Sequence, residues 1–126
     1  MNGFRFSNTA DEYNSQDYFV ARMPANLTTI DELFLALKTQ LKFPEYFGFN
    51  WNAVTDCLRD FAWIEQRRII LVHQGRLMLS ENELSIYVDV LAEAVSDWED
   101  GEHSFEVVFR GEDREVVENI LKFKGR

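Results

Sequence analysis

The sequence predicts a small α/β domain of three-layer-like build, with a short, mostly parallel sheet of three strands and about four helices. A possible extra strand lies at the N-terminus. Three observations predict this class. Short β-type segments alternate along the chain with longer segments of helical periodicity. Two helical segments begin with capping boxes, Thr29–Glu32 and Ser80–Glu83. Residues 68–72 (RIILV) form an apolar run, which is typical of a parallel strand buried on both faces.

Two strands are expected in the N-terminal part of the chain. Aromatic and polar side chains alternate over residues 4–7, which is a weak strand signal. Residues 18–23 (YFVARM) give a stronger signal, which ends at Pro24. The polar residues 8–17 between them are predicted to form a loop.

Two helices are expected next. The first follows Thr29 and ends just before Pro44, because a proline disfavours the helical conformation in the preceding residue. Gly48 offers a turn, and Asn50 is a suitable N-cap for a second helix over about residues 51–60.

The C-terminal half is expected to contain two strands and two helices. The strand at 68–72 is followed by a long acidic helix that begins after Ser80 and stops near Gly101. Residues 105–109 (FEVVF) predict the next strand, and residues 113–123 a short last helix. Eight apolar residues are expected in the core: Leu33, Leu37, Leu58, Ile70, Leu71, Leu91, Val95 and Val107.

Length and composition indicate one domain spanning residues 1–126. The hydrophobic fraction of 46% is enough for an ordinary core, and a single cysteine excludes an intramolecular disulfide. The polar, mixed-charge start of the chain lacks the apolar region of a secretory signal, and no apolar run is long enough to span a membrane. We therefore expect a cytoplasmic protein that is monomeric when free.

The chain is acidic, with 22 acidic and 13 basic residues and a net charge of −9. This sign disfavours binding to nucleic acid or to an anionic membrane. Nearly all of the excess lies between Ser80 and Glu102, where eight acidic residues occur without a lysine or arginine. Such a segment is either a solvated helix face or a surface that steers a cationic partner, and both interpretations remain open.

Known catalytic and cofactor motifs are absent. The sequence has no glycine-rich phosphate loop, and His73 and His103 lie outside any zinc-binding arrangement, so no cofactor or metal is expected. His73 ends a predicted buried strand, where a hydrogen-bonded structural role is favoured. Cys57, Asp56 and His73 could form a thiol triad, but their spacing is not diagnostic. Cys57 lies on the apolar side of its helix, so a buried, unreactive thiol is favoured.

One segment combines aromatic and acidic residues in an unusual way. Residues 44–63 contain six aromatic side chains close to Asp56 and Asp60. Some of these rings are expected to pin the loop and helix to the core. The same mixture is also typical of a protein-binding hot spot, in which rings supply contact area and acids bond to a partner's Arg or Lys.

The residues FPEYFGFNWNA at 43–53, followed by Asp56-Cys57-Leu58, resemble the signature of the barstar family of intracellular ribonuclease inhibitors. The similarity is free of gaps over about fifteen residues, and the order of elements fits from about residue 18 to 109. The flanking segments look like additions to the family core. The resemblance implies a non-catalytic inhibitor that plugs the active site of a basic ribonuclease or ribonuclease-type toxin, in an immunity or antitoxin role.

The resemblance also implies which residues bind the partner. Tyr46 matches the loop tyrosine, Asn50 the asparagine before the helix, and Asp56 the aspartate that occupies the enzyme's phosphate site. Glu93 matches an outlying contact glutamate on the long helix. The full set of expected partner-binding residues is Tyr46, Phe47, Asn50, Trp51, Asn52, Thr55, Asp56, Asp60, Phe61 and Glu93.

Four of these positions depart from the family pattern. Asn52 replaces a second contact aspartate, and Thr55 replaces a contact tryptophan. Asp60 stands where the family has a glycine, and Phe61 where it has a tryptophan. These changes imply a different ribonuclease partner, weaker binding, or a relative that has lost inhibition, and tight binding to barnase itself is not expected.

Two alternatives stay open. The protein could be an acidic nucleic-acid mimic or regulator of another cationic partner, in which case binding would depend on the acids of residues 80–102 more than on Asp56. It could instead be an enzyme that uses Cys57, in which case the native thiol would react rapidly with thiol reagents.

Overall fold

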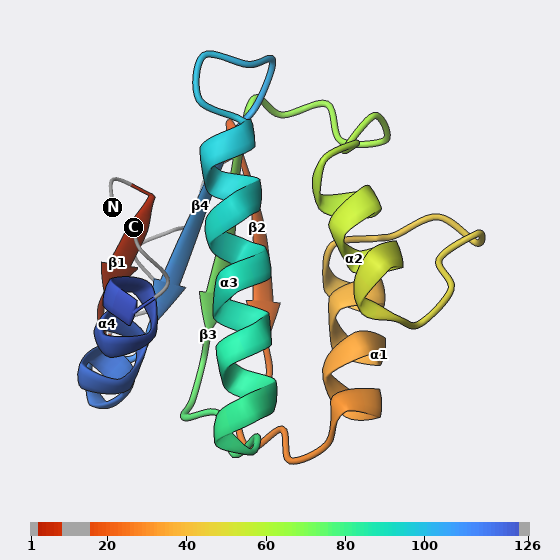
Figure 1. Cartoon of the computed structure of the whole chain (residues 1–126). Coiled ribbons are helices and arrows are strands. Elements are labelled where there is room, and N and C mark those ends of the chain that lie inside the picture. Colours follow the sequence, from red (N-terminus) through yellow and green to blue (C-terminus); the bar gives the residue numbers. More distant parts are fainter. Residues whose placement is uncertain (1–2, 9–15, 124–126) are drawn as a thin grey trace.

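The computed structural model describes residues 3–8 and 16–123 and has an α/β architecture (Figure 1). Part of the predicted N-terminal loop, residues 9–15, lies outside the described residues. The elements in chain order are β1 (Phe4–Phe6), β2 (Tyr18–Met23), α1 (Ile30–Gln40), α2 (Trp51–Leu58), β3 (Arg68–His73), α3 (Glu81–Asp97), β4 (Ser104–Phe109), a 3-10 turn (Gly111–Asp113) and α4 (Arg114–Phe123).

The sheet has four strands in the order β1-β4-β3-β2, and all neighbouring strands are parallel. The possible N-terminal strand is therefore real, and the sheet is wholly rather than mostly parallel. β1 pairs with β4, so that Phe4 lies opposite Val107. Parallel strands need long crossover connections, and the helices between β2, β3 and β4 supply them.

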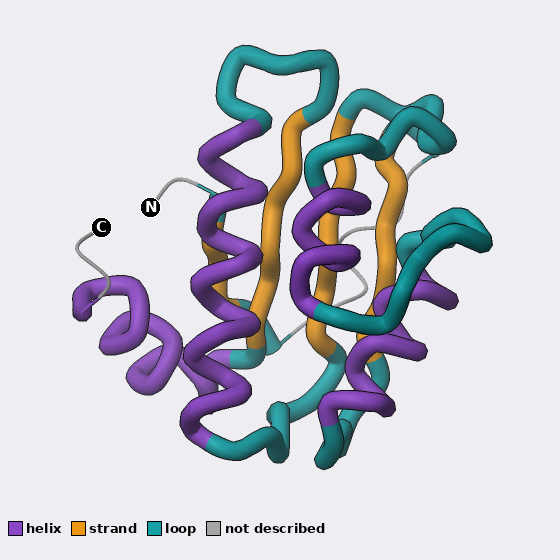
Figure 2. The backbone as a smooth tube through the Cα atoms, turned by 45° about the vertical axis from the view of Figure 1, so that its right-hand side comes forward, coloured by secondary structure: helices purple, strands orange, loops and turns teal. Residues whose placement is uncertain are grey.

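The helices α1, α2 and α3 lie on the same face of the sheet (Figures 1 and 2). The helix α4 packs against α3, beside β1 at one edge. All eight residues predicted for the core are buried. Seven lie in the main core, whereas Ile70 packs with Val72 and Val108 on the other face of the sheet. Both faces of β3 are thus buried, as its apolar sequence predicts.

Both capping boxes form as predicted. The Thr29 hydroxyl accepts the Glu32 backbone N–H at 3.2 Å, and the Ser80 hydroxyl accepts that of Glu83 at 3.2 Å. The structure corrects three boundaries. The helix α1 ends at Gln40 and not just before Pro44, as predicted. The helix α2 ends at Leu58, two residues before the predicted end, because the chain turns through Arg59 to Phe61, which has a φ of 48°. The last helix begins with a 3-10 turn.

Candidate protein-binding surface

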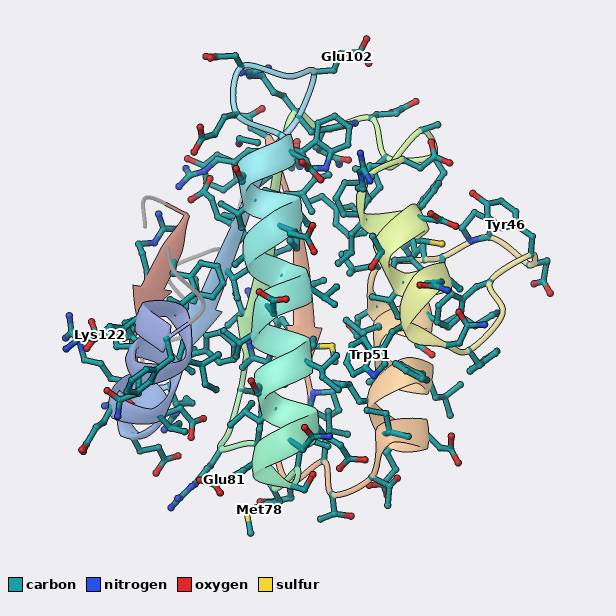
Figure 3. All side chains as sticks on the ribbon, viewed as in Figure 1. Tyr46, Trp51, Met78, Glu81, Glu102 and Lys122 are labelled. Carbon is teal, nitrogen blue, oxygen red and sulfur yellow. The ribbon has the colours of Figure 1, made fainter. Side chains whose placement is uncertain are left out.

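The loop of residues 44–50 and the helix α2 form one continuous unit, which we call the loop–helix surface. At the C-terminal end of α2, the Tyr46 hydroxyl donates a hydrogen bond to Asp60 Oδ2 at 3.0 Å. At the N-terminal end, Asn50 Oδ1 accepts the Ala53 backbone N–H at 2.8 Å and caps the helix as predicted. The loop therefore runs back along α2, and Tyr46 projects outward from it (Figure 3).

Five of the expected partner-binding residues in or directly after this unit are exposed, and two are half-buried. Tyr46 is 65% exposed. Asn52 and Asp56 lie one turn apart on the exposed side of α2, and Asp60 lies exposed just beyond its C-terminal end. Asn50 is exposed at the N-cap, while Trp51 and Thr55 lie at the margin of the surface, half-buried. Helical spacing thus brings Asn52 and Asp56 to one face, and the bond between Tyr46 and Asp60 adds the loop at its C-terminal end.

Two expected contact residues do not reach the surface. Phe47 is 4% exposed, and its ring packs against Phe43 and Phe34 with centroid separations of 5.0 and 6.3 Å. Phe61 is fully buried and stacks on Trp98 with a centroid separation of 5.9 Å. Both rings support the loop–helix surface from below. A run of aromatic residues in a sequence does not reveal which rings face the core.

The acids of this region differ in their internal partners. Asp60 accepts the Tyr46 hydroxyl, and Asp97 at the end of α3 pairs with Arg59 at 3.1 Å. The Asp56 carboxylate makes no hydrogen bond or ion pair within the described residues, and neither does the exposed carboxylate of Glu93. Asp56 is therefore an available carboxylate in the middle of the surface.

The acids of this surface raise the pKa values of the neighbouring Tyr46 and Cys57 side chains. Burial, together with the nearby carboxylates of Asp60 and Asp56, raises the pKa of Cys57 to about 11. The hydrogen bond to Asp60 raises the pKa of Tyr46 above its ordinary value of 10.0. Cys57 is buried and protonated at neutral pH, which argues against nucleophilic catalysis by this residue.

The C-terminal end of α2 is tied firmly to the rest of the fold. The Trp98 indole Nε1 donates a hydrogen bond to the Leu58 carbonyl at 2.7 Å, which joins α3 to the last turn of α2. The Arg59–Asp97 ion pair joins the same two helices on the outside. A surface held in this way needs little rearrangement to bind a partner.

The expected set omits three residues of this region. Phe49 is 46% exposed and lies immediately before the N-cap. Arg59 places a cation among the acids, and Asp97 holds it. The sequence shows Phe49 as one aromatic among several and gives no signal for the pairing of Arg59 with Asp97, which are 38 positions apart.

The histidines have structural roles. His73 Nδ1 lies 2.9 Å from the Val108 carbonyl, and Nε2 lies 2.7 Å from the Tyr87 hydroxyl. Because a carbonyl only accepts, Nδ1 carries the proton and Nε2 accepts from Tyr87. Within residues 3–8 and 16–123, no three metal-ligating side chains cluster together. None of the described helices is both long and apolar enough to cross a bilayer.

A comparison with protein families gives a clear result. The model of the family described as Barstar (barnase inhibitor) matches residues 19–110, nearly three quarters of the chain. The whole loop–helix surface lies inside the match, while β1 and α4 lie outside it. A search of curated proteins finds no match. Members of the matched family are inhibitors rather than enzymes and bind barnase-type ribonucleases. On the strength of this match and of its α/β fold, the chain belongs to the barstar family.

Proposed function

We propose that this protein binds a basic, barnase-type ribonuclease or ribonuclease-type toxin and blocks its active site. The observation that carries the proposal is the state of Asp56, an exposed carboxylate at the centre of the loop–helix surface that has no side-chain partner among residues 3–8 and 16–123. Ribonuclease active sites gather cationic side chains to bind phosphate. A carboxylate that is free of internal bonds can enter such a cluster and form charge-assisted hydrogen bonds.

The neighbouring residues complete the contact. Tyr46 presents an exposed ring at the C-terminal end of α2, and its hydroxyl is fixed by Asp60. A fixed aromatic side chain supplies contact area at a low entropic cost. Asn52 adds a hydrogen-bonding group one turn before Asp56, with Thr55 at the border, while Asn50 lies at the N-cap, where its amide makes internal bonds. Inhibition follows from occlusion of the substrate site, without chemistry by the inhibitor.

The proposed biological role is protection of the cell that makes the ribonuclease. This role places the protein in the cytoplasm, where an active ribonuclease would degrade the cell's own RNA. The acidic segment between Ser80 and Glu102 accelerates the approach of a basic enzyme.

The proposal is tested by assaying, with a fluorogenic RNA substrate, the inhibition of a panel of purified barnase-type ribonucleases, barnase included. We expect wild-type protein to inhibit at least one enzyme. Asp56→Ala should raise the inhibition constant by at least thirtyfold, because loss of a desolvated charge pair costs about 2 kcal/mol or more. This range of costs was measured in part on the barnase–barstar pair itself. Glu115→Gln, a matched loss of one charge on α4, should change it less than twofold.

Two results would contradict the proposal. One is the failure of wild-type protein to inhibit any enzyme of the panel. The other is a loss of less than about fivefold, or about 1 kcal/mol, for Asp56→Ala in a complex that does form. Binding that survives Asp56→Ala but is lost when the acids of residues 80–102 are neutralised would support the alternative, an acidic protein that regulates another cationic partner.

A further inference from the structure

Phe49 is an exposed aromatic residue at the N-terminal end of the loop–helix surface. It lies directly before the N-cap Asn50, and 46% of its side chain is exposed. Its φ of 52° places the backbone in the left-handed region, where a side chain is strained. Gly48, which could adopt this conformation without strain, is the preceding residue and does not adopt it.

The fold does not explain a phenyl ring at this position. One side of the ring packs on Phe47 with a centroid separation of 4.8 Å, and nearly half of the side chain still faces solvent. Glycine or asparagine would adopt the same backbone conformation with less strain and would expose no ring. Strained residues that persist on a surface are concentrated at functional sites.

The ring is also held in a fixed position. Phe47, on which it packs, is wedged against Phe34 and Phe43 in the core. The chain on either side of Phe49 is held as well, because Asn50 Nδ2 donates a hydrogen bond to the Gly48 carbonyl at 3.2 Å and so joins the two neighbours of Phe49. A ring fixed in this way loses little freedom when it enters a partner.

Phe49 and Tyr46 mark opposite ends of α2. Tyr46 is bonded to Asp60 beyond the C-terminal end of the helix, and Phe49 adjoins the N-cap. An eight-residue helix is on the order of 12 Å long. The two exposed rings therefore bracket Asp56 along the helix.

We propose that Phe49 is a second aromatic anchor, which inserts into an apolar recess of the ribonuclease on the side of its cation cluster opposite to Tyr46. This inference rests on the proposed function and adds a criterion for the partner. The cognate enzyme must offer an apolar recess beside its phosphate-binding site, and enzymes that present a charged rim at this point are bound less tightly. Phe49 is thus a specificity-determining residue.

The inference is tested by measuring the association and dissociation rates of Phe49→Asn with the enzyme of the panel that wild-type protein inhibits most strongly. Asparagine tolerates a positive φ, so the variant removes the ring without straining the loop. We expect dissociation at least ten times faster, an association rate and salt dependence within threefold of wild type, and an unchanged urea midpoint. Phe49→Tyr should restore most of the affinity. Leu35→Gln, which removes an exposed apolar side chain from α1, should change affinity less than twofold.

The outcomes separate the two proposals. If Phe49→Asn binds like wild type while Asp56→Ala does not, this inference is overturned and the proposed function stands. A loss of affinity accompanied by an equal loss of stability would also overturn it, because the ring would then be structural. If no enzyme of the panel is inhibited, or if Asp56→Ala has no effect, the proposed function fails and this inference fails with it.

Discussion

Asn52 lies exposed in the first turn of α2, one helical turn before Asp56. The first turn of this helix carries no acidic residue, although negative charge is favourable there. Asn52→Asp should therefore stabilise the fold by about 0.3–1 kcal/mol. It should also restore the second contact aspartate of the family and increase affinity for barnase itself at least tenfold.

Inhibition assays with barnase and urea denaturation measure the two effects of Asn52→Asp separately. Asn119→Asp on α4 is a control with the same change of charge on an exposed helical asparagine. Equal effects of the two variants on inhibition would show that net charge, and not the position of the carboxylate, governs binding to barnase.

His73 makes stability depend on pH. Burial lowers its pKa to about 4 from 6.5, so between these values the unfolded chain binds a proton that the folded protein excludes. Stability should therefore be constant above the unfolded pKa and decrease as the pH falls, by about 2 kcal/mol between pH 7.5 and 5.

Urea denaturation at pH 8, 6.5 and 5 measures this dependence, with His73→Asn for comparison. The variant is expected to be less stable at pH 8, because Tyr87 loses its acceptor, but to show a flatter pH dependence. The raised pKa of Asp113 acts in the opposite direction and is common to both proteins. Parallel curves for the two proteins would contradict the assignment to His73.

At the scale of elements, the Trp98 indole hydrogen bond ties the C-terminal end of α2 to α3, beside the Arg59–Asp97 ion pair. Trp98→Phe keeps a ring against Phe61 but removes the donor to the Leu58 carbonyl. We expect the free energy of unfolding to fall by about 1–2 kcal/mol and the amides at the end of α2 to exchange faster.

Trp63→Phe is a matched control for this prediction. It removes a similar indole bond, from Trp63 Nε1 to the Leu41 carbonyl at 2.9 Å, which lies at the end of α1. It should reduce stability to a similar extent without accelerating exchange in α2. Unchanged exchange in α2 of Trp98→Phe would show that this bond does not hold the helix.

Local sequence signals predict most elements of the fold. The capping boxes before α1 and α3 and the Asn50 cap of α2 each specify a helix start through bonds between near neighbours. Turn conformations are less predictable. Gly48 and Gly101 suggest left-handed turns, but the adjacent Phe49 and Asp100 have the positive φ values of 52° and 62°. A glycine permits such a conformation and does not impose it.

The candidate site is predictable only in part. Helical periodicity places Asn52 and Asp56 on one face of α2, because their spacing alone fixes their side of the helix, but it does not place Asp60, which follows the end of α2 at Leu58. The burial of Phe47 and Phe61 could not be predicted, since it depends on contacts with Phe34, Phe105 and Trp98 from distant elements. Tertiary packing decides which aromatic residues of a short segment remain exposed.

At the scale of the whole molecule, the distribution of charge should govern the rate of association. Glu99 and Glu102 are exposed beyond the end of α3 at which Asp97 pairs with Arg59. Figure 3 shows Glu102 in the loop that follows this helix. Neutralising both with glutamine should slow association with a basic ribonuclease severalfold at low salt and leave dissociation unchanged. The difference should disappear at high salt, because ions screen exposed charges.

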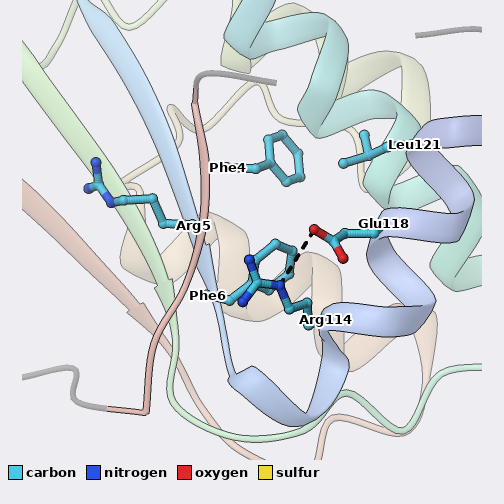
Figure 4. A pocket seen from close by; sticks show the side chains of 6 residues that line it. All are labelled: Phe4, Arg5, Phe6, Arg114, Glu118 and Leu121. Carbon is cyan, nitrogen blue, oxygen red and sulfur yellow. Dashed lines mark hydrogen bonds and ion pairs between the residues drawn. The ribbon is translucent and has the colours of Figure 1, made fainter.

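Stopped-flow association at increasing ionic strength measures this effect. The control is the double variant Glu112→Gln and Glu115→Gln, which removes two exposed charges near the start of α4. The helix α4 and the strand β1 line a shallow cavity of about 470 Å³, which lies away from the loop–helix surface (Figure 4). If both double variants slow association equally, the net charge of the protein and not the acidic end of α3 steers the encounter.

The pairing of β1 with β4 determines the order in which the sheet can be completed. Phe4 lies opposite Val107, so β1 cannot pair until β4 has been synthesised. Contacts between residues so far apart in sequence raise the contact order and slow folding. During synthesis, β2 and β3 can pair while β1 still lacks its neighbour. The edge strand β1 therefore joins the sheet only after β4 has left the ribosome, so its addition is a late step in the folding of each newly synthesised chain.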